Sequence, residues 1–259
     1  MTEPLIIRFG GVRFGYEDPD AIGFHVNPDG FTGWNDGVDV RRDEIAIPNG
    51  HGALEVPSYL TQRIVSVEGY CLAENPRRLG WWRGRLVGLM ARAAQQFSAE
   101  EFGHLQYAQG SVAVKPRFSP DGGTAQADYQ ISFWFAKPQI YGELNKFEHP
   151  TAASPLELVT THYGNHDAHA EFILAGNAPS YRVAGPGGRN YLVSRAMVPG
   201  HDHHVDMRTG RLTIDGVVQQ LAVDIGQTWP NPPGVQVTQT LHLSSGTASF
   251  KSRVRNTSV

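Results

Sequence analysis

A histidine-rich segment, GHDHHVDM at residues 200–207, holds the side chains of this chain that are best suited to chemistry. On a β-strand, side chains two residues apart point to the same face, so His201 and His203 would share one face and His204 the other. Imidazole and carboxylate groups together suit zinc or a non-haem iron. The candidate ligands in this segment are His201, His203, His204 and Asp206.

A second group of similar residues lies upstream and could approach the first group across a sheet. It consists of His166, Asp167, His169 and Glu171. The two groups do not form an HExxH motif, and nothing in the sequence fixes a third ligand in space. We therefore interpret the segment as a polar, exposed hairpin, and we predict neither a bound metal nor a cofactor.

Other catalytic patterns are missing from the sequence. There is no GxSxG turn for a serine nucleophile, and AGPGGRN at 184–190 precedes a strand rather than a helix, so it is not a dinucleotide-binding loop. The 25 acidic residues offer no distinguishable catalytic pair. The single cysteine, Cys71, excludes an intrachain disulfide and is expected to pack as a small apolar residue. We predict no catalytic residue and no enzymatic activity.

Composition narrows the remaining classes of protein. The chain has 259 residues, of which 40% are hydrophobic and 18% charged, with 29 glycines and 17 prolines, which suits many short strands joined by tight turns. Thirteen basic and 16 acidic residues precede residue 143 and nine of each follow, so no basic surface for nucleic acid is expected. No signal peptide, and no apolar run long enough to insert into a membrane, is expected either.

Residues 75–97 are predicted to form the only long helix. Asn75 suits the N-cap, and Pro76 suits the first helical position. Apolar residues follow at spacings of three and four, as in an amphipathic helix: Leu79, Trp82, Leu86, Leu89, Ala93 and Phe97. Five arginines lie mostly off this stripe: Arg77, Arg78, Arg83, Arg85 and Arg92. They form either a solvated face or a protein interface, where Arg and Trp are favoured.

Short strands surround this helix in the first half of the chain. The expected strands are 5–14 with a Gly-Gly break, 64–69 ending at Gly69, 111–118, and 126–136. In the last of these, Phe133 and Phe135 alternate with Trp134, which would face outward. Turns are expected within 24–37, at 48–52 and at 119–123, and a polar connection at 100–109.

The second half is predicted to be a separate β-sandwich. We place the domain boundary near Gly142 and interpret residues 143–155 as a linker, because they are polar and lack periodicity. Eight short strands and no helix are expected beyond it, within LELVTTHY, AHAEFILAG, SYRVA, NYLVSRAMV, HHVDM, RLTID, GVQVTQTLHL and TASFKSRV. Trp229 either lines a sugar-binding face or packs on neighbouring prolines, and packing is favoured.

Several motifs together resemble the distal tail protein family of long-tailed bacteriophages (siphoviruses), whose members include minor tail proteins of actinobacterial phages. The pattern HG…VPSYLTQRIVSVEGYCLAENP resembles the first-domain signature of the family, and DYQISFWFAKPQIYGE resembles the strand that ends this domain. The runs AEFILAGNAPSYRV, HVDMRTGRLTIDGV and QTWPNPPGVQVTQTL are similar to its galectin-like domain. Lys137–Pro138–Gln139 departs from the charged pair usual before Tyr-Gly.

This resemblance implies a mainly β protein in two domains. Residues 1–142 would form a β-sandwich-like, ring-forming domain with one helix, and residues 143–259 a galectin-like, jelly-roll β-sandwich. Such proteins form homohexameric rings in the virion, at the tip of a long non-contractile tail. The partners would be the major tail tube protein, the tape-measure protein and the tail-associated or baseplate hub proteins, while DNA passes through without sequence-specific binding.

The resemblance and the residue types together suggest an interface. We expect subunit or tube contacts at Trp81, Trp82, Arg83, Arg85 and Trp134, because ring closure needs head-to-tail contacts with anchor aromatics. The alternative function is a carbohydrate-binding adhesion protein that recognises host surface glycans. The two functions are compatible, because a hub can carry a weak glycan-binding domain.

Overall fold

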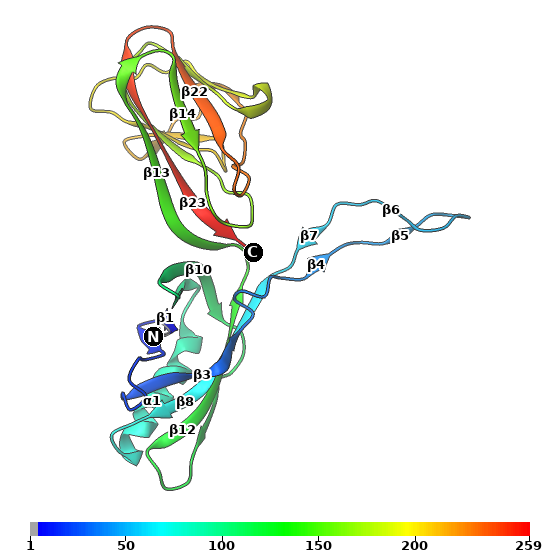
Figure 1. Ribbon diagram of the computed structural model, residues 1–259, viewed down its shortest axis with the longest axis vertical. Helices are drawn as coiled ribbons and strands as arrows, with labels where there is room; N and C mark the ends of the chain where they lie inside the picture. Colours follow the sequence, from blue (N-terminus) through cyan, green and yellow to red (C-terminus); the bar gives the residue numbers. More distant parts are fainter. Residues whose placement is uncertain (1–4) are drawn as a thin grey trace. The chain divides into compact units, whose positions relative to one another are not determined.

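The computed structural model describes residues 5–259 and is mainly β, with one α-helix, as the sequence predicts (Figure 1). The chain divides into two compact units, one comprising residues up to Ile140 together with Val259, the other Tyr141–Ser258. Each unit has its own hydrophobic core. The helix has 13 residues, and no helix within residues 5–259 is long and apolar enough to cross a membrane.

The first unit is a closed, barrel-like sheet of seven strands. Its order is β12-β8-β3-β2-β1-β9-β10, and β10 pairs again with β12 through Ser111–Trp134 and Val112–Phe133. All pairings are antiparallel except the short β2–β3 bridge at Phe14 and Phe24. The bounds are β1 (Ile6–Phe9), β2 (Val12–Phe14), β3 (Gly23–Thr32), β8 (Arg63–Leu72), β9 (Gln95–Glu101), β10 (His104–Val112) and β12 (Gln126–Phe135), with β11 (Arg117–Pro120) added beside β12.

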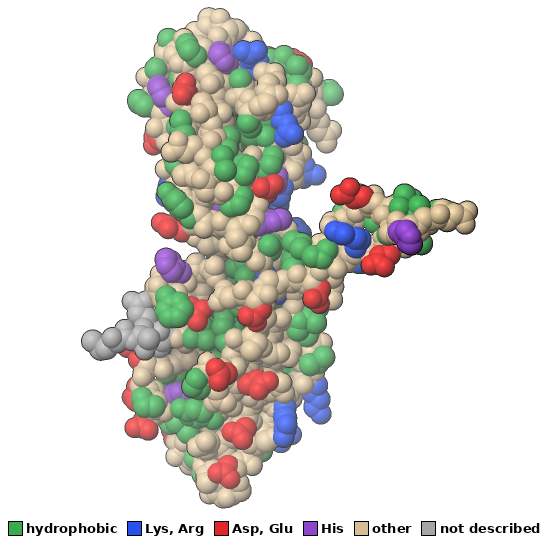
Figure 2. All heavy atoms as spheres, turned by 45° about the vertical axis from the view of Figure 1, so that its right-hand side comes forward, with side chains coloured by type: hydrophobic (Ala, Val, Ile, Leu, Met, Phe, Trp, Pro, Cys, Tyr) green, Lys and Arg blue, Asp and Glu red, His purple; other side chains and the backbone are tan. Residues whose placement is uncertain are grey.

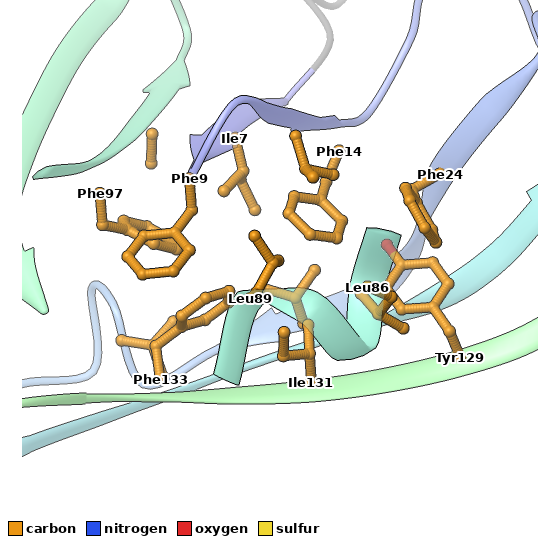
Figure 3. Close-up of a cluster of buried hydrophobic side chains, with 14 of the residues drawn as sticks. Ile7, Phe9, Phe14, Phe24, Leu86, Leu89, Phe97, Tyr129, Ile131 and Phe133 are labelled. Carbon is orange, nitrogen blue, oxygen red and sulfur yellow. The ribbon is translucent and has the colours of Figure 1, made fainter. Parts of the chain in front are cut away.

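Aromatic side chains fill the first unit (Figure 3). The rings of Phe9 and Phe133 meet edge to face, with centroids 4.8 Å apart, and Phe97 meets Phe133 at 4.9 Å. Helix α1 (Pro76–Gly88) and the 3-10 turn η1 (Leu89–Ala91) add Leu86 and Leu89 to the same cluster. Trp34 is also buried and packs 5.0 Å from Phe97, so it is a core residue.

The predicted start of the helix is confirmed, whereas its predicted end is wrong. The Asn75 side chain accepts a hydrogen bond from the Arg78 amide at 3.0 Å, and Pro76 begins the helix. The helix ends at Gly88 rather than near residue 97, and Phe97 lies on β9 between its partners Phe9 and Ala108. The two-sided pairing of β9 outweighs the helical spacing of its apolar residues.

Two more boundaries in the first half differ from the prediction. Gly69 does not end its strand, because β8 continues to Leu72; a Cβ at Gly69 would lie on the His25 carbonyl of the paired strand. Residues 100–109 are not a polar connection but a β9–β10 hairpin, which turns at Phe102 and Gly103 with positive φ angles. Leu105 and Gln106, on β10, therefore pair with Glu100 and Ala99.

The second unit is a β-sandwich whose two sheets enclose one core. One sheet has the order β13-β23-β15-β18-β19-β20 and the other β14-β22-β16-β17-β21. Its bounds are β13 (Ile140–Ala153), β14 (Leu156–Thr160), β15 (Glu171–Asn177), β16 (Tyr181–Ala184), β17 (Asn190–Val193), β18 (His203–Asp206), β19 (Arg211–Ile214), β20 (Val217–Val218), β21 (Val223–Gly226), β22 (Val237–Leu243) and β23 (Thr247–Ser258), with a 3-10 turn η2 (Pro186–Gly188).

All eight strands predicted in the second half are present, but the linker is wrong. Residues 143–155 fall almost entirely within the 14-residue strand β13, whose side chains are mostly half-buried or exposed. A strand that buries few side chains keeps a polar composition, so its sequence cannot be told from a linker. Strands β20 and β21 were not predicted. The galectin-like and ring-forming assignments of the two units remain predictions.

Candidate functional site: an exposed arm and an arginine–tryptophan helix

A long hairpin arm interrupts the first unit between β3 and β8 (Figure 1). Its stem pairs β4 (Val40–Arg41) with β7 (Tyr59–Leu60), and its distal part pairs β5 (Ile45–Ala46) with β6 (Ala53–Leu54). The expected turn at 48–52 closes it, with the Ile47 amide donating to the Gly52 carbonyl at 3.2 Å. Every residue from 39 to 60 is exposed except Val56, which is half-buried.

The arm presents exposed apolar side chains together with charged ones (Figure 2), with Arg41 and Arg42 at its stem and three carboxylates beyond them. Its exposed apolar residues are Val40, Ile45, Ile47, Leu54, Tyr59 and Leu60. Between residues 43 and 62 the only carboxylates are Asp43, Glu44 and Glu55, and this stretch has no Lys or Arg. A two-stranded hairpin is at best marginally stable alone in water. An uncovered hairpin with so many exposed apolar groups is typical of a segment that another molecule covers.

The base of the arm is held by one buried arginine. The Arg63 guanidinium donates to the carbonyls of Gly33 (2.7 Å), Trp34 (2.5 Å) and Pro138 (3.0 Å), and Arg63 is 1% exposed. Burial lowers the pKa of Arg63, and Asp36 opposes this shift. Trp34, beside the base, also donates from Nε1 to the Gln106 side chain at 2.9 Å. The arm therefore leaves the barrel from a fixed point.

Helix α1 carries a cluster of arginine and tryptophan side chains that contact one another. The ring of Trp81 meets that of Trp82 edge to face at 4.8 Å, and the guanidinium carbons of Arg78 and Arg85 lie 4.8 Å and 5.5 Å from the Trp81 ring centroid. Arg85 also donates to the Gly11 carbonyl at 2.9 Å. Cation–π contacts of this kind hold the arginines in place while leaving their charge exposed.

The two tryptophans play different parts. Trp81 is 45% exposed, whereas Trp82 is half-buried and packs edge to face on Phe24 at 5.4 Å. The Nε1–H of Trp82 is buried and has no hydrogen-bond partner within the described chain. Trp81 is therefore the residue available to a partner, and Trp82 anchors the helix to the core.

A groove of about 320 Å³ lies beside Trp81. Helix α1 and η1 line one side of it, and the turn between β1 and β2 lines the other. The helix side is formed by Trp81, Gly84, Arg85, Gly88, Leu89 and Arg92. The surface is aromatic, cationic and open to the helix backbone at its glycines.

The structure brings only part of the predicted interface together. Trp81 contacts both Trp82 and Arg85. Arg83 instead lines a separate hollow with Phe118 and Pro120. Trp134 lies on the outer face of β12, opposite the buried Phe133 and Phe135, and its cross-strand neighbour is the exposed Ile64. The assignment of these residues to subunit or tube contacts remains a prediction.

The sequence predicts the turn at 48–52 but not the arm around it as a candidate site. The available signal was a run of apolar residues on both sides of a Gly-rich turn, without the periodicity of a core strand.

The histidine-rich segment does not assemble a metal site: no group of three or more His, Cys, Asp or Glu side chains suited to a metal occurs within residues 5–259. His201 pairs with Asp215, with Nδ1 and Oδ2 2.5 Å apart, and His204 pairs with Glu171 at 3.3 Å. The upstream group does approach across the sheet, since Glu171 lies opposite Asp206.

His203 belongs to the core of the second unit. It is 1% exposed, and its Nδ1 is hydrogen-bonded to the Tyr181 hydroxyl at 3.0 Å. Burial lowers the pKa of His203, and Arg195 lowers it further against the opposing effects of the Ala196 backbone, Asp202 and Asp215. Burial also lowers the pKa of His169, with Arg208 acting in the same direction. His203 is thus a hydrogen-bonded core residue rather than a metal ligand.

Two further candidate residues are also part of a core. Burial raises the pKa of the Cys71 thiol to about 12, so the thiolate that a nucleophile requires does not form near neutral pH. Trp229 is 1% exposed and its ring centroid lies 6.0 Å from that of Phe172. The interpretation of Trp229 as an exposed sugar-binding surface is therefore wrong, and Trp229 packs in the core of the second unit.

The comparisons with known proteins concern the fold. No protein-family model matches the chain, and no curated protein is similar to it in sequence. Among solved structures, the fold is similar to that of the SPP1 Dit protein, described as a paradigm of the hub adsorption apparatus in phages that infect Gram-positive bacteria. The TM-score is 0.69 at 14% identity, over 96% of this chain and 98% of that one.

A component of the phage P2 baseplate in its activated conformation also matches, at a TM-score of 0.47 and 9% identity over 97% of this chain and 98% of that one. The chain therefore has a two-unit, mainly β fold. Its likeness to SPP1 Dit, at 14% identity, shows that the two proteins share this fold.

Proposed function

We propose that this protein is a structural hub of a phage tail tip. The carrying observation is the exposed arm on a barrel-like first unit, in a chain whose fold matches SPP1 Dit over nearly its whole length. The arm has no covering surface on its own chain, and a ring of identical subunits supplies one. In such a ring each copy uses one surface to receive its neighbour and a different surface to contact the next copy.

The ring is proposed to be a homohexamer at the end of a long non-contractile tail. Its neighbours are the major tail tube protein, the tape-measure protein and the tail-associated or baseplate hub proteins. The second, galectin-like unit would be carried by the ring, and DNA would pass through the ring without base-specific contact. Neither a catalytic activity nor a cofactor belongs to this function.

The glycan-binding alternative has no specific surface in its favour. Trp229, which would have formed the aromatic platform for a sugar, is buried. Binding of host glycans by the second unit stays an alternative that a glycan array tests directly.

The ring itself is tested by light scattering of the purified chain over a range of concentrations, backed by negative-stain images. The expected result is a mass of six chains and a six-fold ring that appears as concentration rises. A monomer at every concentration would contradict a self-assembling ring. A closed ring with a different number of subunits would contradict the hexamer but not the proposed hub function.

A further inference from the structure

We infer that the groove beside Trp81 receives the distal arm of a second copy of this chain, an inference that rests on the proposed ring. The distal arm and the groove are opposite in charge, and each is left uncovered within its own unit. The groove is the receiving surface, and the acidic and apolar face of the arm is its occupant.

The charge of the groove is unbalanced on its own chain. Arg85 and Arg92 line it, and no carboxylate lies within ion-pair distance of either one in residues 5–259. The one acidic partner of the helix is Glu74, whose carboxylate lies 3.7 Å from Arg78. A carboxylate from outside would therefore meet guanidinium groups with free donors, which favour a planar, two-oxygen contact.

The shape of the groove suits an extended backbone. A Cβ built at Gly84 or Gly88 would meet no atom within 4 Å, so the helix surface is open between Trp81 and Arg92. The exposed Trp81 ring forms a flat apolar wall, and Arg78 and Arg85 fix its position. Aromatic and arginine anchors of this kind carry much of the binding energy of protein interfaces.

One face of the arm has the matching chemistry. Ile45 lies directly across from Leu54, so the two side chains share a face of the hairpin. The carboxylates of Asp43, Glu44 and Glu55 flank this pair in the sequence. The distal arm therefore offers an isoleucine and a leucine to the exposed Trp81 ring, and nearby carboxylates to the arginines.

A second copy is the occupant that these features favour. The stretch from residue 43 to 62 carries three carboxylates and no Lys or Arg, opposite in sign to the groove. Because the arm and the groove are different surfaces, each copy can give its arm to one neighbour and its groove to the other. Contacts of this head-to-tail kind close into rings.

The test is a disulfide cross-link between two variants of the full chain, Ile45→Cys and Gly84→Cys, mixed at ring-forming concentration and oxidised with copper–phenanthroline. The natural cysteine, Cys71, is fully buried and does not interfere. We expect a linked dimer from the mixture and at least tenfold less from Ile45→Cys mixed with Gly122→Cys, whose position is equally open but lies in the β11–β12 turn.

The outcomes separate this inference from the proposed function. If the mixed variants form rings but no cross-linked dimer, the groove is not the receiving site, and the hub proposal still stands. Absence of both rings and cross-link at every concentration overturns both. A third outcome concerns a chain that carries both substitutions. If this chain forms a disulfide within itself at high dilution, while the mixed single variants form no linked dimer, the occupant of the groove is the chain's own arm and the second copy is overturned.

Discussion

The Arg63 guanidinium donates from Nη1 to the Trp34 carbonyl at 2.5 Å, which joins the start of β8 to the loop where the arm begins. The two residues are 29 positions apart, and the whole arm lies between them. Both are buried, so their contact is part of the core as well as the root of the arm. Whatever the arm binds, its direction is set here.

Replacing Arg63 with methionine should therefore destabilise the first unit and release the arm. Three carbonyls lose a charged donor, which should lower the free energy of unfolding by about 3 kcal/mol. Urea denaturation measures this loss, and faster tryptic cleavage at Arg41 and Arg42 reports release of the arm. The matched change Arg117→Met, at an exposed site, should cost less than about 0.5 kcal/mol. Equal losses for the two variants would contradict the anchoring role.

The β9–β10 turn stores removable strain at Phe102. This residue has φ of 50° and is 67% exposed, and Gly103 follows with φ of 73°, as in a type I′ turn. Because asparagine adopts this left-handed conformation at a lower cost than phenylalanine, Phe102→Asn should raise the free energy of unfolding by about 1 kcal/mol. Thermal denaturation checks it. Leu105→Asn, on the neighbouring regular strand, should give no such gain; a decrease for Phe102→Asn would show that the ring is held by packing.

The sequence predicts where most helices and strands lie but fewer of the residues at which they begin and end. These ends are set by the pairing of strands that are distant in the sequence. Phe97 fits the helical stripe that begins at Leu79, yet it is used by β9, because β1 and β10 both pair with that strand. Gly69 signals a strand end, but it occurs where the His25 backbone comes too close for a side chain. Both decisions depend on segments distant in sequence, which local patterns do not contain.

The candidate site is less predictable than the fold. Trp81 and Arg85 are visible as interface residue types, but the Gly11 carbonyl that positions Arg85 lies 74 residues away. The arm is invisible to periodicity because its side chains face solvent rather than a core. The polar strand β13 is hidden for a similar reason. Sequence patterns record burial within one chain, and surfaces that another molecule covers leave only a weak trace.

Stability of the second unit should fall as the pH drops below about 6.5, the usual pKa of histidine. The folded-state pKa values of His203 and His169 are lowered, so between the folded and unfolded values the unfolded chain binds more protons. Unfolding is thereby favoured on acidification, and the loss levels off below the folded pKa values. Urea denaturation at pH 7.5 and 5.5 measures the difference. His203→Gln should make it smaller, whereas the same change at exposed His51 should not.

Charge reversal on the helix should separate assembly from folding. Arg83 and Arg85 are exposed, so Arg83→Glu with Arg85→Glu should leave the free energy of unfolding within about 1 kcal/mol of the parent. Ring formation should need at least tenfold more protein, because Arg85 lines the groove proposed to receive the acidic arm and its reversal makes that contact repulsive. Light scattering measures the shift, and Arg182→Glu, an exposed arginine of the second unit, is the control. Unchanged assembly would remove the helix from the interface.

Replacing Gly84 with leucine should raise the stability of the folded monomer and weaken the assembly of the ring. Glycine in an exposed helix interior costs about 0.8 kcal/mol relative to a good helix former, so both Gly84→Leu and Gly80→Leu should raise the melting temperature. The Cβ atom at each position has open space within the chain, and both glycines lie on the exposed side of the helix. Only Gly84 lines the groove beside Trp81, whereas Gly80 lines the separate hollow near Phe118. Light scattering should therefore show assembly lost for Gly84→Leu and kept for Gly80→Leu. Loss in both would point to a broader helix contact, and loss in neither would exclude the groove.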